Sequence, residues 1–347
     1  MKHRATIGAI LLCFLLMSVG SIVAQGEKLH VLATTTIIAD VARNVGGDLV
    51  EVESLIPPDA DVHAFEPAPD DIVKVAEADI LLVNGAGLES FLGTLLENAG
   101  GVEPVVVSNG VAMLPFGEHG HEEGDEARSE EEHAVGEVIG VLSEDGVCEG
   151  AHEHESEAEH EEGEEDHEHG ACDPHVWTDP KNVMIWVDNI AEAFADAAPN
   201  NAETYRANAE AYKAELESLD TEVSEILTVI PADKRILVTN HEFLGYFAHA
   251  YGFEVVGVVI GGGGTLSEPD PRELAALIDV ITEEQVTAIF VEVSANPGLA
   301  ETIASETGID VVTTIYSDSL SKANGPAATY LDYLRYNART IAQALAD

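Results

Sequence analysis

Three histidines stand at turns in this sequence, and each could hold a metal ion. His63 lies in PPDADVHAFEP, His175 lies in CDPHVWTDP, and His241 directly follows the apolar run RILVTN. Asp318, in TTIYSDSL, also follows an expected strand, and ligands of open α/β sheets bind outside the carboxyl ends of the strands. Three imidazoles and one carboxylate complete a four-coordinate zinc site. Because no two of the four share a short metal-binding motif, their spacing leaves an alternative open, in which each histidine only fixes its own turn by a hydrogen bond.

The other histidines have different settings. His30 begins an expected strand and His249 lies within an expected helix, so neither is a candidate ligand. Eight more lie in residues 117–170, together with 22 acidic residues and one arginine. Most of this tract cannot bury enough apolar surface to pack, although AVGEVIGVL is interpreted as a short strand or hairpin within it. Its second half is predicted to hold weak accessory metal ligands, namely His152, His154, His160, His167 and His169.

Short apolar runs alternate with amphipathic helical patterns on both sides of the tract. This alternation predicts an α/β fold with two domains. Between the domains, apolar residues spaced alternately by four and three residues predict one helix over 202–227. At 1.5 Å per residue it is a rod of roughly 38 Å, long enough to cross from one domain to the other. The predicted organisation is a signal peptide at 1–25, an N-terminal α/β lobe at 26–200 with 117–170 as an insertion, a linker helix at 201–228 and a C-terminal α/β lobe at 229–347.

The net charge indicates which partners the protein binds, and the N-terminal segment indicates its cellular compartment. The 65 acidic residues against 15 Lys and Arg leave a net charge of -50, which disfavours nucleic acid as a partner and favours cations. Residues 1–25 combine two basic residues, an apolar run and a small-residue end, which is typical of a secretory signal peptide; an uncleaved anchor is the alternative. Cys13 lacks the small residues that precede a lipidated cysteine, so lipidation is not expected.

Export would leave Cys148 and Cys172 as an even pair in an oxidising compartment. This predicts a disulfide between them. The alternative is that the two thiolates join the histidines on a metal, which needs reducing conditions.

Several segments resemble the metal-specific solute-binding proteins of bacterial zinc and manganese ABC importers. They include TTTIIADVARNVGG, DADVHAFEPAPDDI, DPHVWTDPKN, TNHEFLGYFAHAYG and YSDSL. The resemblance runs from about His30 to the C-terminus, apart from the acidic tract. It implies two α/β lobes joined by one long rigid helix, a metal in the cleft between them, and His63, His175, His241 and Asp318 as its ligands. Manganese members resemble one another in having glutamate where this chain has His241, whereas zinc members have histidine, so the resemblance implies the zinc type.

The resulting hypothesis is an extracytoplasmic, monomeric receptor that binds Zn²⁺ with high affinity and delivers it to the membrane permease of an ABC importer. No catalytic residues are predicted. A manganese or other divalent-metal receptor of the same type is one alternative. A zinc hydrolase would need water in the fourth ligand place, which Asp318 would fill, and the chain has no HExxH helix. A periplasmic zinc buffer that relies on the tract is the third alternative.

Overall fold

A computed structural model describes residues 28–100, 102–116, 140–142, 148–149, 172–261, 265 and 271–346. At positions 140, 141, 148 and 149 only the backbone is described. The predicted signal peptide and all five accessory histidines of the tract lie outside these residues and stay predictions. No helix in the described part of the chain is long and apolar enough to cross a membrane.

The N-terminal half forms a parallel sheet with the strand order β2-β1-β3-β4. Its third strand, ILLV, is buried at every position, as expected when helices cover a parallel sheet. The strands are β1 (Leu29–Ala33), β2 (Val50–Ser54), β3 (Ile80–Val83) and β4 (Pro104–Val106), and the helices are α1 (Thr36–Gly46), α2 (Pro69–Glu77), α3 (Leu92–Ala99) and α4 (Pro180–Ala197), with 3₁₀ turns η1 (Gly47–Leu49) and η2 (Val176–Thr178).

The C-terminal half forms a second parallel sheet with the order β11-β10-β8-β9. When the strands of each sheet are numbered in chain order, both sheets therefore have the strand order 2-1-3-4. In this order the connections leave on opposite sides of the first strand, and such switch points are where open α/β sheets bind ligands. The elements are β8 (Ile236–Thr239), β9 (Glu254–Val258), β10 (Ala288–Glu292) and β11 (Asp310–Ile315), with α6 (Gly245–Tyr251), α7 (Pro271–Glu283), α8 (Gly298–Thr307), α9 (Tyr330–Leu345) and the 3₁₀ turn η4 (Ala232–Lys234). A further 3₁₀ turn, η3 (Pro199–Asn201), lies between α4 and the helix that connects the halves.

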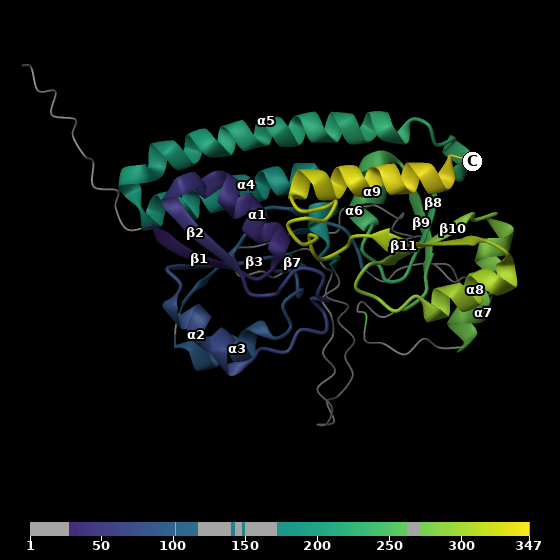
Figure 1. The fold of residues 1–347 in the computed structure, drawn as a ribbon, viewed down its shortest axis with the longest axis horizontal. Coiled ribbons are helices and arrows are strands. Elements are labelled where there is room, and N and C mark those ends of the chain that lie inside the picture. Colours follow the sequence, from purple (N-terminus) through teal and green to yellow (C-terminus); the bar gives the residue numbers. More distant parts are fainter. Residues whose placement is uncertain are drawn as a thin grey trace, which may run out of the picture.

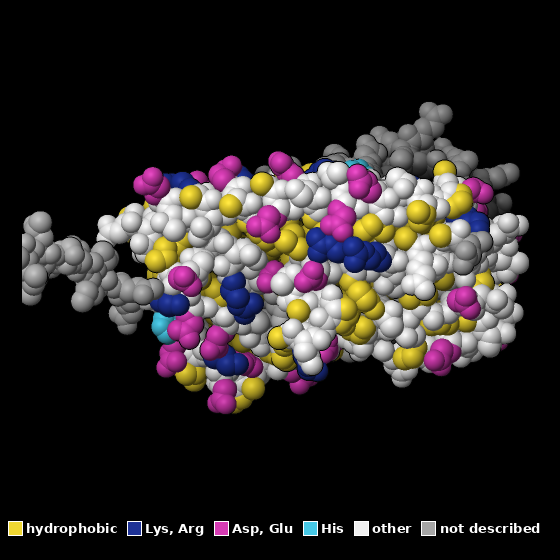
Figure 2. All heavy atoms as spheres, turned by 45° about the horizontal axis from the view of Figure 1, so that its top comes forward, with side chains coloured by type: hydrophobic (Ala, Val, Ile, Leu, Met, Phe, Trp, Pro, Cys, Tyr) yellow, Lys and Arg dark blue, Asp and Glu magenta, His cyan; other side chains and the backbone are white. Residues whose placement is uncertain are grey.

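One long helix, α5 (Ala202–Leu227), connects the halves and confirms the predicted helix. It runs along one side of both sheets, with α9 beside it (Figure 1). Six residues of the apolar stripe predicted for α5 are buried, namely Tyr205, Ala209, Tyr212, Leu216, Leu219 and Val223. The seventh predicted residue, Ile226, is only half-buried, and its neighbour Leu227 is buried instead. Ion pairs of Arg335 and Arg339 on α9 with Glu222 on α5 add polar contacts between the two helices. Figure 2 shows acidic and basic side chains close together on the face that these helices form.

The acidic tract leaves the N-terminal half and returns to it at one place. A small antiparallel sheet contains β5 (Ala112–Met113), β6 (Gly140–Leu142) and β7 (Cys148–Glu149), and Pro115 pairs with Cys172 in an antiparallel bridge. The strand predicted within AVGEVIGVL is thus confirmed at its end, where Leu142 is buried. The Cys148–Cys172 disulfide stays a prediction, because the Cys148 side chain is not described.

Candidate metal centre

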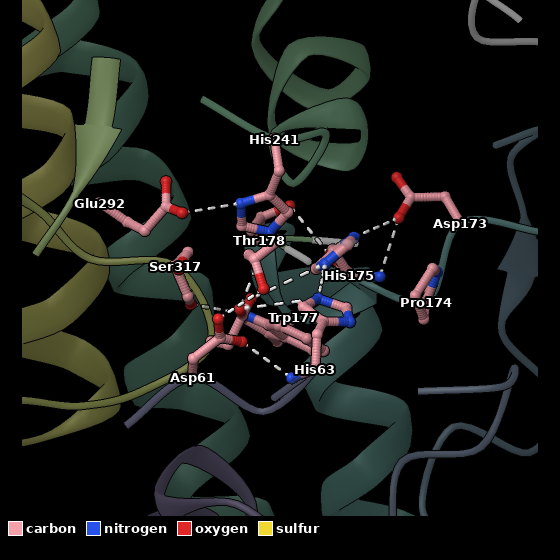
Figure 3. Close-up of polar contacts among 12 residues, drawn as sticks. Asp61, His63, Asp173, Pro174, His175, Trp177, Thr178, His241, Glu292 and Ser317 are labelled. Atoms are coloured by element: carbon pink, nitrogen blue, oxygen red, sulfur yellow. Dashed lines mark hydrogen bonds and ion pairs between the residues drawn. The ribbon is translucent and has the colours of Figure 1, made fainter. Parts of the chain in front are cut away.

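The four side chains singled out in the sequence meet at one point. His63, His175, His241 and Asp318 each offer one ligand-type atom within 4.8 Å of the others. The Nε2 atoms of His63 and His175 are 3.3 Å apart. The Asp318 carboxylate oxygens lie 3.7–3.8 Å from Nε2 of all three histidines, which converge in Figure 3. Bonds of 2.0–2.1 Å to a tetrahedral zinc ion would separate its ligands by roughly 3.3 Å, so these spacings suit such an ion.

Each half of the chain supplies two of these side chains. His63 lies in the loop between β2 and α2, and His175 directly precedes η2 and α4. Helix α4 begins sharply because Asp179 caps it, accepting the Lys181 N–H at 2.8 Å, and Pro180 occupies its first turn. His241 and Asp318 follow β8 and β11 at their carboxyl ends. Both side chains therefore lie beyond strand ends, as predicted from the sequence.

Asp318 comes from the C-terminal half, but hydrogen bonds tie its segment to the N-terminal half. The Ser317 carbonyl accepts a hydrogen bond from Trp177 Nε1–H at 3.0 Å, as Figure 3 shows. The Asp59 backbone N–H donates to Ser319 Oγ at 2.8 Å. Residues on both sides of Asp318 are thus held in place across the boundary between the halves, which local sequence patterns do not reveal.

Aspartates two residues before His63 and His175 shape both histidine turns. Asp173 Oδ1 accepts the His175 backbone N–H at 2.9 Å and lies 2.8 Å from His175 Nδ1. Asp61 Oδ1 accepts the His63 backbone N–H at 2.9 Å, and Asp61 Oδ2 accepts a hydrogen bond from the Thr265 hydroxyl. Sequence reasoning missed both aspartates, although the Asp-x-His spacing shared by DVH and DPH is a usable signal.

Glu292 supports His241 in a similar way. His241 Nδ1 lies 3.0 Å from Glu292 Oε1, and Asn240 Nδ2 donates to the same oxygen at 3.2 Å. Glu292 is the last residue of the buried strand AIFVE and is only 1 % exposed. Sequence reasoning missed this residue too, although a glutamate in a wholly buried strand signals a polar partner.

Among the four candidate ligands, two buried side-chain atoms lack hydrogen-bond partners within the described residues: His241 Nε2 and Asp318 Oδ1. His175, His241 and Asp318 are buried, and His63 is half-buried. A buried polar atom without a partner is costly, and a coordinated cation would satisfy both atoms at once. The donor set therefore fits a divalent metal ion.

The protonation states of the centre are set by burial and by neighbouring charges. Burial, together with the charge of His241, holds the pKa of His175 well below its usual range. Burial also lowers the pKa of His241, but the charge and hydrogen bond of Glu292 outweigh it and raise that pKa to about 9. Burial raises the pKa of Asp318 to about 7. Near neutral pH, His175 thus offers the lone pair of Nε2, whereas a metal must displace a proton from His241.

The two histidines not expected to bind metal lie elsewhere. His30 is in β1, where its backbone N–H donates to Asp79, and His249 is in α6. Both side chains are exposed. Neither belongs to the group that gathers around Asp318.

Comparison with known families places the chain. The family model described as zinc-uptake complex component A, periplasmic, matches residues 31–344, which include all four side chains of the centre. The chain belongs to this family. The resemblance to metal-specific solute-binding proteins and the two-lobed α/β fold predicted from the sequence are confirmed.

Individual relatives in and around this family are named for different metals. The manganese-binding lipoprotein MntA of Halalkalibacterium halodurans is 30% identical over 92% of this chain and 90% of its own length. The iron-binding protein YfeA of Yersinia pestis is 31% identical over 91% of this chain and 86% of its own. The solved structure of the periplasmic zinc binding protein TroA from Treponema pallidum matches with a TM-score of 0.70 and 27% identity, covering 92% of this chain and all of that one. Because the family model describes an uptake component and these relatives are binding proteins, the prediction that the chain is not an enzyme is also confirmed.

Proposed function

We propose that the protein is an extracytoplasmic receptor that captures a divalent metal ion and delivers it to the membrane permease of an ABC importer. The observation that carries this proposal is the convergence of three imidazoles and one carboxylate, with the buried atoms His241 Nε2 and Asp318 Oδ1 lacking hydrogen-bond partners among the described residues. Membership of the uptake family supports it. The ligands are His63, His175, His241 and Asp318, in a cleft between lobes that span 26–200 and 229–347 on either side of the linker helix.

Zinc is the proposed cargo. Imidazole nitrogens suit zinc, whereas harder manganese takes more oxygen ligands, and three of the four ligands here are imidazoles. The names of the relatives support a manganese or iron receptor of the same type as the second candidate. The choice of zinc over manganese and iron rests on the ligand set, and above all on His241.

Charge around the site favours loading with a divalent cation. The carboxylates of Asp61, Asp173 and Glu292 lie against the histidine ligands, and Asp318 supplies a fourth carboxylate. Their negative charge compensates an ion that leaves its hydration shell for a largely buried place. The two histidine rings held by Asp173 and Glu292 through Nδ1 present Nε2 to the ion, an arrangement that raises ligand basicity.

Three remaining parts of the proposal concern the whole protein. The acidic tract adds weak zinc ligands at His152, His154, His160, His167 and His169. The Cys148–Cys172 disulfide closes the loop that contains these histidines. A signal peptide directs the protein to the periplasm, where it works as a monomer. A pure zinc buffer is the less favoured function, because the compact centre lies outside the tract.

Metal analysis tests both levels of the proposal. The full-length protein is purified without added metal, its bound metals are counted, and zinc and manganese then compete for it. We expect one tightly held zinc per chain. Absence of any tight metal would refute the receptor function, whereas one tight site that prefers manganese would refute only the choice of zinc.

A further inference from the structure

We propose that Asn84 is a positioning residue that fixes the metal ligand His175 through the backbone next to it. The inference rests on the proposed metal site and deepens it. Asn84 directly follows β3 and is fully buried, and Glu89, in the same loop between β3 and α3, holds it in place. The four converging side chains include neither residue, so their effect on metal binding must pass through His175.

The peptide unit before His175 is held at both of its polar ends. Asn84 Nδ2 donates to the Pro174 carbonyl at 3.0 Å, and the Val176 backbone N–H donates to the same carbonyl at 2.9 Å. At the other end, the His175 N–H donates to Asp173 Oδ1 at 2.9 Å. Figure 3 shows this turn beside the centre. Because a peptide unit is planar and rigid, these contacts together fix the direction in which the His175 side chain leaves the backbone.

A small error in this direction matters at the metal centre. His175 Nε2 lies 3.3 Å from Nε2 of His63 and 3.7 Å from Asp318 Oδ1. Functional groups of this kind must be held within about 0.5 Å of their productive geometry. Because the imidazole projects from the backbone, a rotation of the peptide before His175 moves Nε2 farther than it moves the backbone atoms. A contact that fixes the peptide therefore fixes a ligand atom.

The orientation of the Asn84 amide follows from its neighbours. Trp186 Nε1–H can only donate, and it donates to Ser108 Oγ at 2.8 Å. Ser108 then has one hydrogen left, which it donates to Asn84 Oδ1 at 3.0 Å. These three side chains are fully buried. The amide oxygen of Asn84 must therefore face Ser108, and the NH2 group must face the Pro174 carbonyl.

The loop that carries Asn84 has an uncommon backbone. Its next three residues all lie in the left-handed region, with φ of 87° at Gly85, 54° at Ala86 and 78° at Gly87. The conformation is easy for glycine but costly for Ala86, whose Cβ crowds the backbone. Such strain persists only where surrounding contacts enforce it, and it is typical of functional sites.

Glu89 supplies the contacts that enforce this conformation. Its Oε1 accepts the Asn84 backbone N–H at 2.7 Å and the Thr34 hydroxyl at 2.7 Å, and its Oε2 accepts the Gly85 N–H at 3.1 Å. The Asn84 side chain also donates to the Gly85 carbonyl at 2.9 Å. Glu89 thus fixes the backbone from which the Asn84 side chain reaches Pro174.

Zinc affinities of full-length variants, measured by competition with a chelator, test the role of Asn84. Asn84→Ala removes the donor to the Pro174 carbonyl. It should weaken zinc binding by about tenfold, the lower end of the loss expected when a group supporting a metal ligand is removed. Glu89→Gln brings an NH2 group among three donors but leaves the Asn84 side chain in place, so it should weaken zinc binding by only about threefold.

Co²⁺ provides a second readout that a merely structural role would not change. Its visible absorption depends on the number and geometry of its ligands. With Co²⁺ bound in place of zinc, the spectrum of N84A should differ from that of wild type, because His175 is displaced.

The matched control is Asn189→Ala. Asn189, in α4, uses its amide in the same way as Asn84, since Nδ2 donates to two backbone carbonyls, those of Val107 at 2.7 Å and Asn109 at 2.9 Å. These carbonyls belong to the loop after β4 in the same lobe. N189A should keep zinc affinity within about twofold of wild type and should keep the wild-type Co²⁺ spectrum. Thermal unfolding verifies that each variant is folded at the temperature of the assay.

Several results would overturn the role of Asn84. They are wild-type zinc affinity in N84A, a weakened N84A whose Co²⁺ spectrum is unchanged, and equal losses in N84A and N189A, which would indicate a general loosening of the lobe. Should N84A fail to fold, E89Q carries the test, and wild-type affinity in E89Q would then overturn the inference. A wild-type protein without a tight metal site would instead refute the receptor function.

Discussion

The pH dependence of zinc affinity offers a quantitative test of the centre. A bound ion needs neutral His241 and ionised Asp318, so each group that carries a proton beforehand must release it. Zinc affinity should therefore rise with pH. As the pH falls, affinity is lost first through the His241 pKa of about 9 and then through the Asp318 pKa of about 7. His175 adds little, since its pKa is held well below its usual range.

The expected magnitude comes from these two values. For each group, competition between the proton and the ion weakens zinc binding by the factor 1 + 10^(pKa − pH). Between pH 8 and pH 6 this factor grows by roughly 100-fold for His241 and by roughly tenfold for Asp318. Zinc affinity should therefore fall by roughly 1000-fold over this range. At pH 7, binding should release about 1.5 protons from these two groups, one from His241 and half of one from Asp318.

The assay is competition with a chelator whose own pH dependence is known, at pH 6, 7 and 8. Calorimetry in buffers with different ionisation heats counts the released protons. Glu292→Gln serves as the matched variant, because the charge of Glu292 is what raises the His241 pKa, so its pH dependence should be shallower. An affinity that changes by less than about tenfold, or that increases toward pH 6, would refute this reasoning.

Three further outcomes are expected. Alanine at any of the four ligands should lower zinc affinity in titrations by orders of magnitude. Alanine at His30 or His249 should leave the affinity within about twofold of wild type. Similar losses at all six positions would contradict the assignment of the four ligands. Deleting 119–138 and 151–169, which spares strands β6 and β7, should leave the tight site intact but slow its loading at scarce zinc in stopped-flow experiments. In the intact protein, the tract should bind zinc at roughly micromolar affinity or weaker. Loss of the tight site after the deletion would show that the tract belongs to the centre. Tyr246→Phe removes a hydroxyl that receives the Leu114 N–H and donates to the Asp173 carbonyl, so the free energy of unfolding should fall by about 1–3 kcal/mol in urea titrations, and an unchanged value would show that these contacts are not stabilising.

Sequence reasoning succeeded where a local pattern is tied to a general rule of folding. The alternating spacing in 202–227 predicted α5 because a helix returns each third or fourth residue to the same face. His241 and Asp318 were placed together because the carboxyl ends of parallel strands meet at one edge of a sheet. The register of β8 and β10, which sets Glu292 against His241, depends on the pairing of distant segments and has no comparable local signal.

The sequence by itself therefore determined the elements, the α/β class and which side chains have metal-binding chemistry, since periodicity, turn residues and ligand type are properties of short segments. The tertiary structure decided that four ligand atoms lie within 4.8 Å, that Ser317 is held by Trp177, and which imidazole nitrogen faces the site. It also decided the charge states of His241 and Asp318. The physical reason is that a pKa and a coordination distance depend on burial and on neighbours brought together from remote parts of the chain, and only packing creates those neighbours.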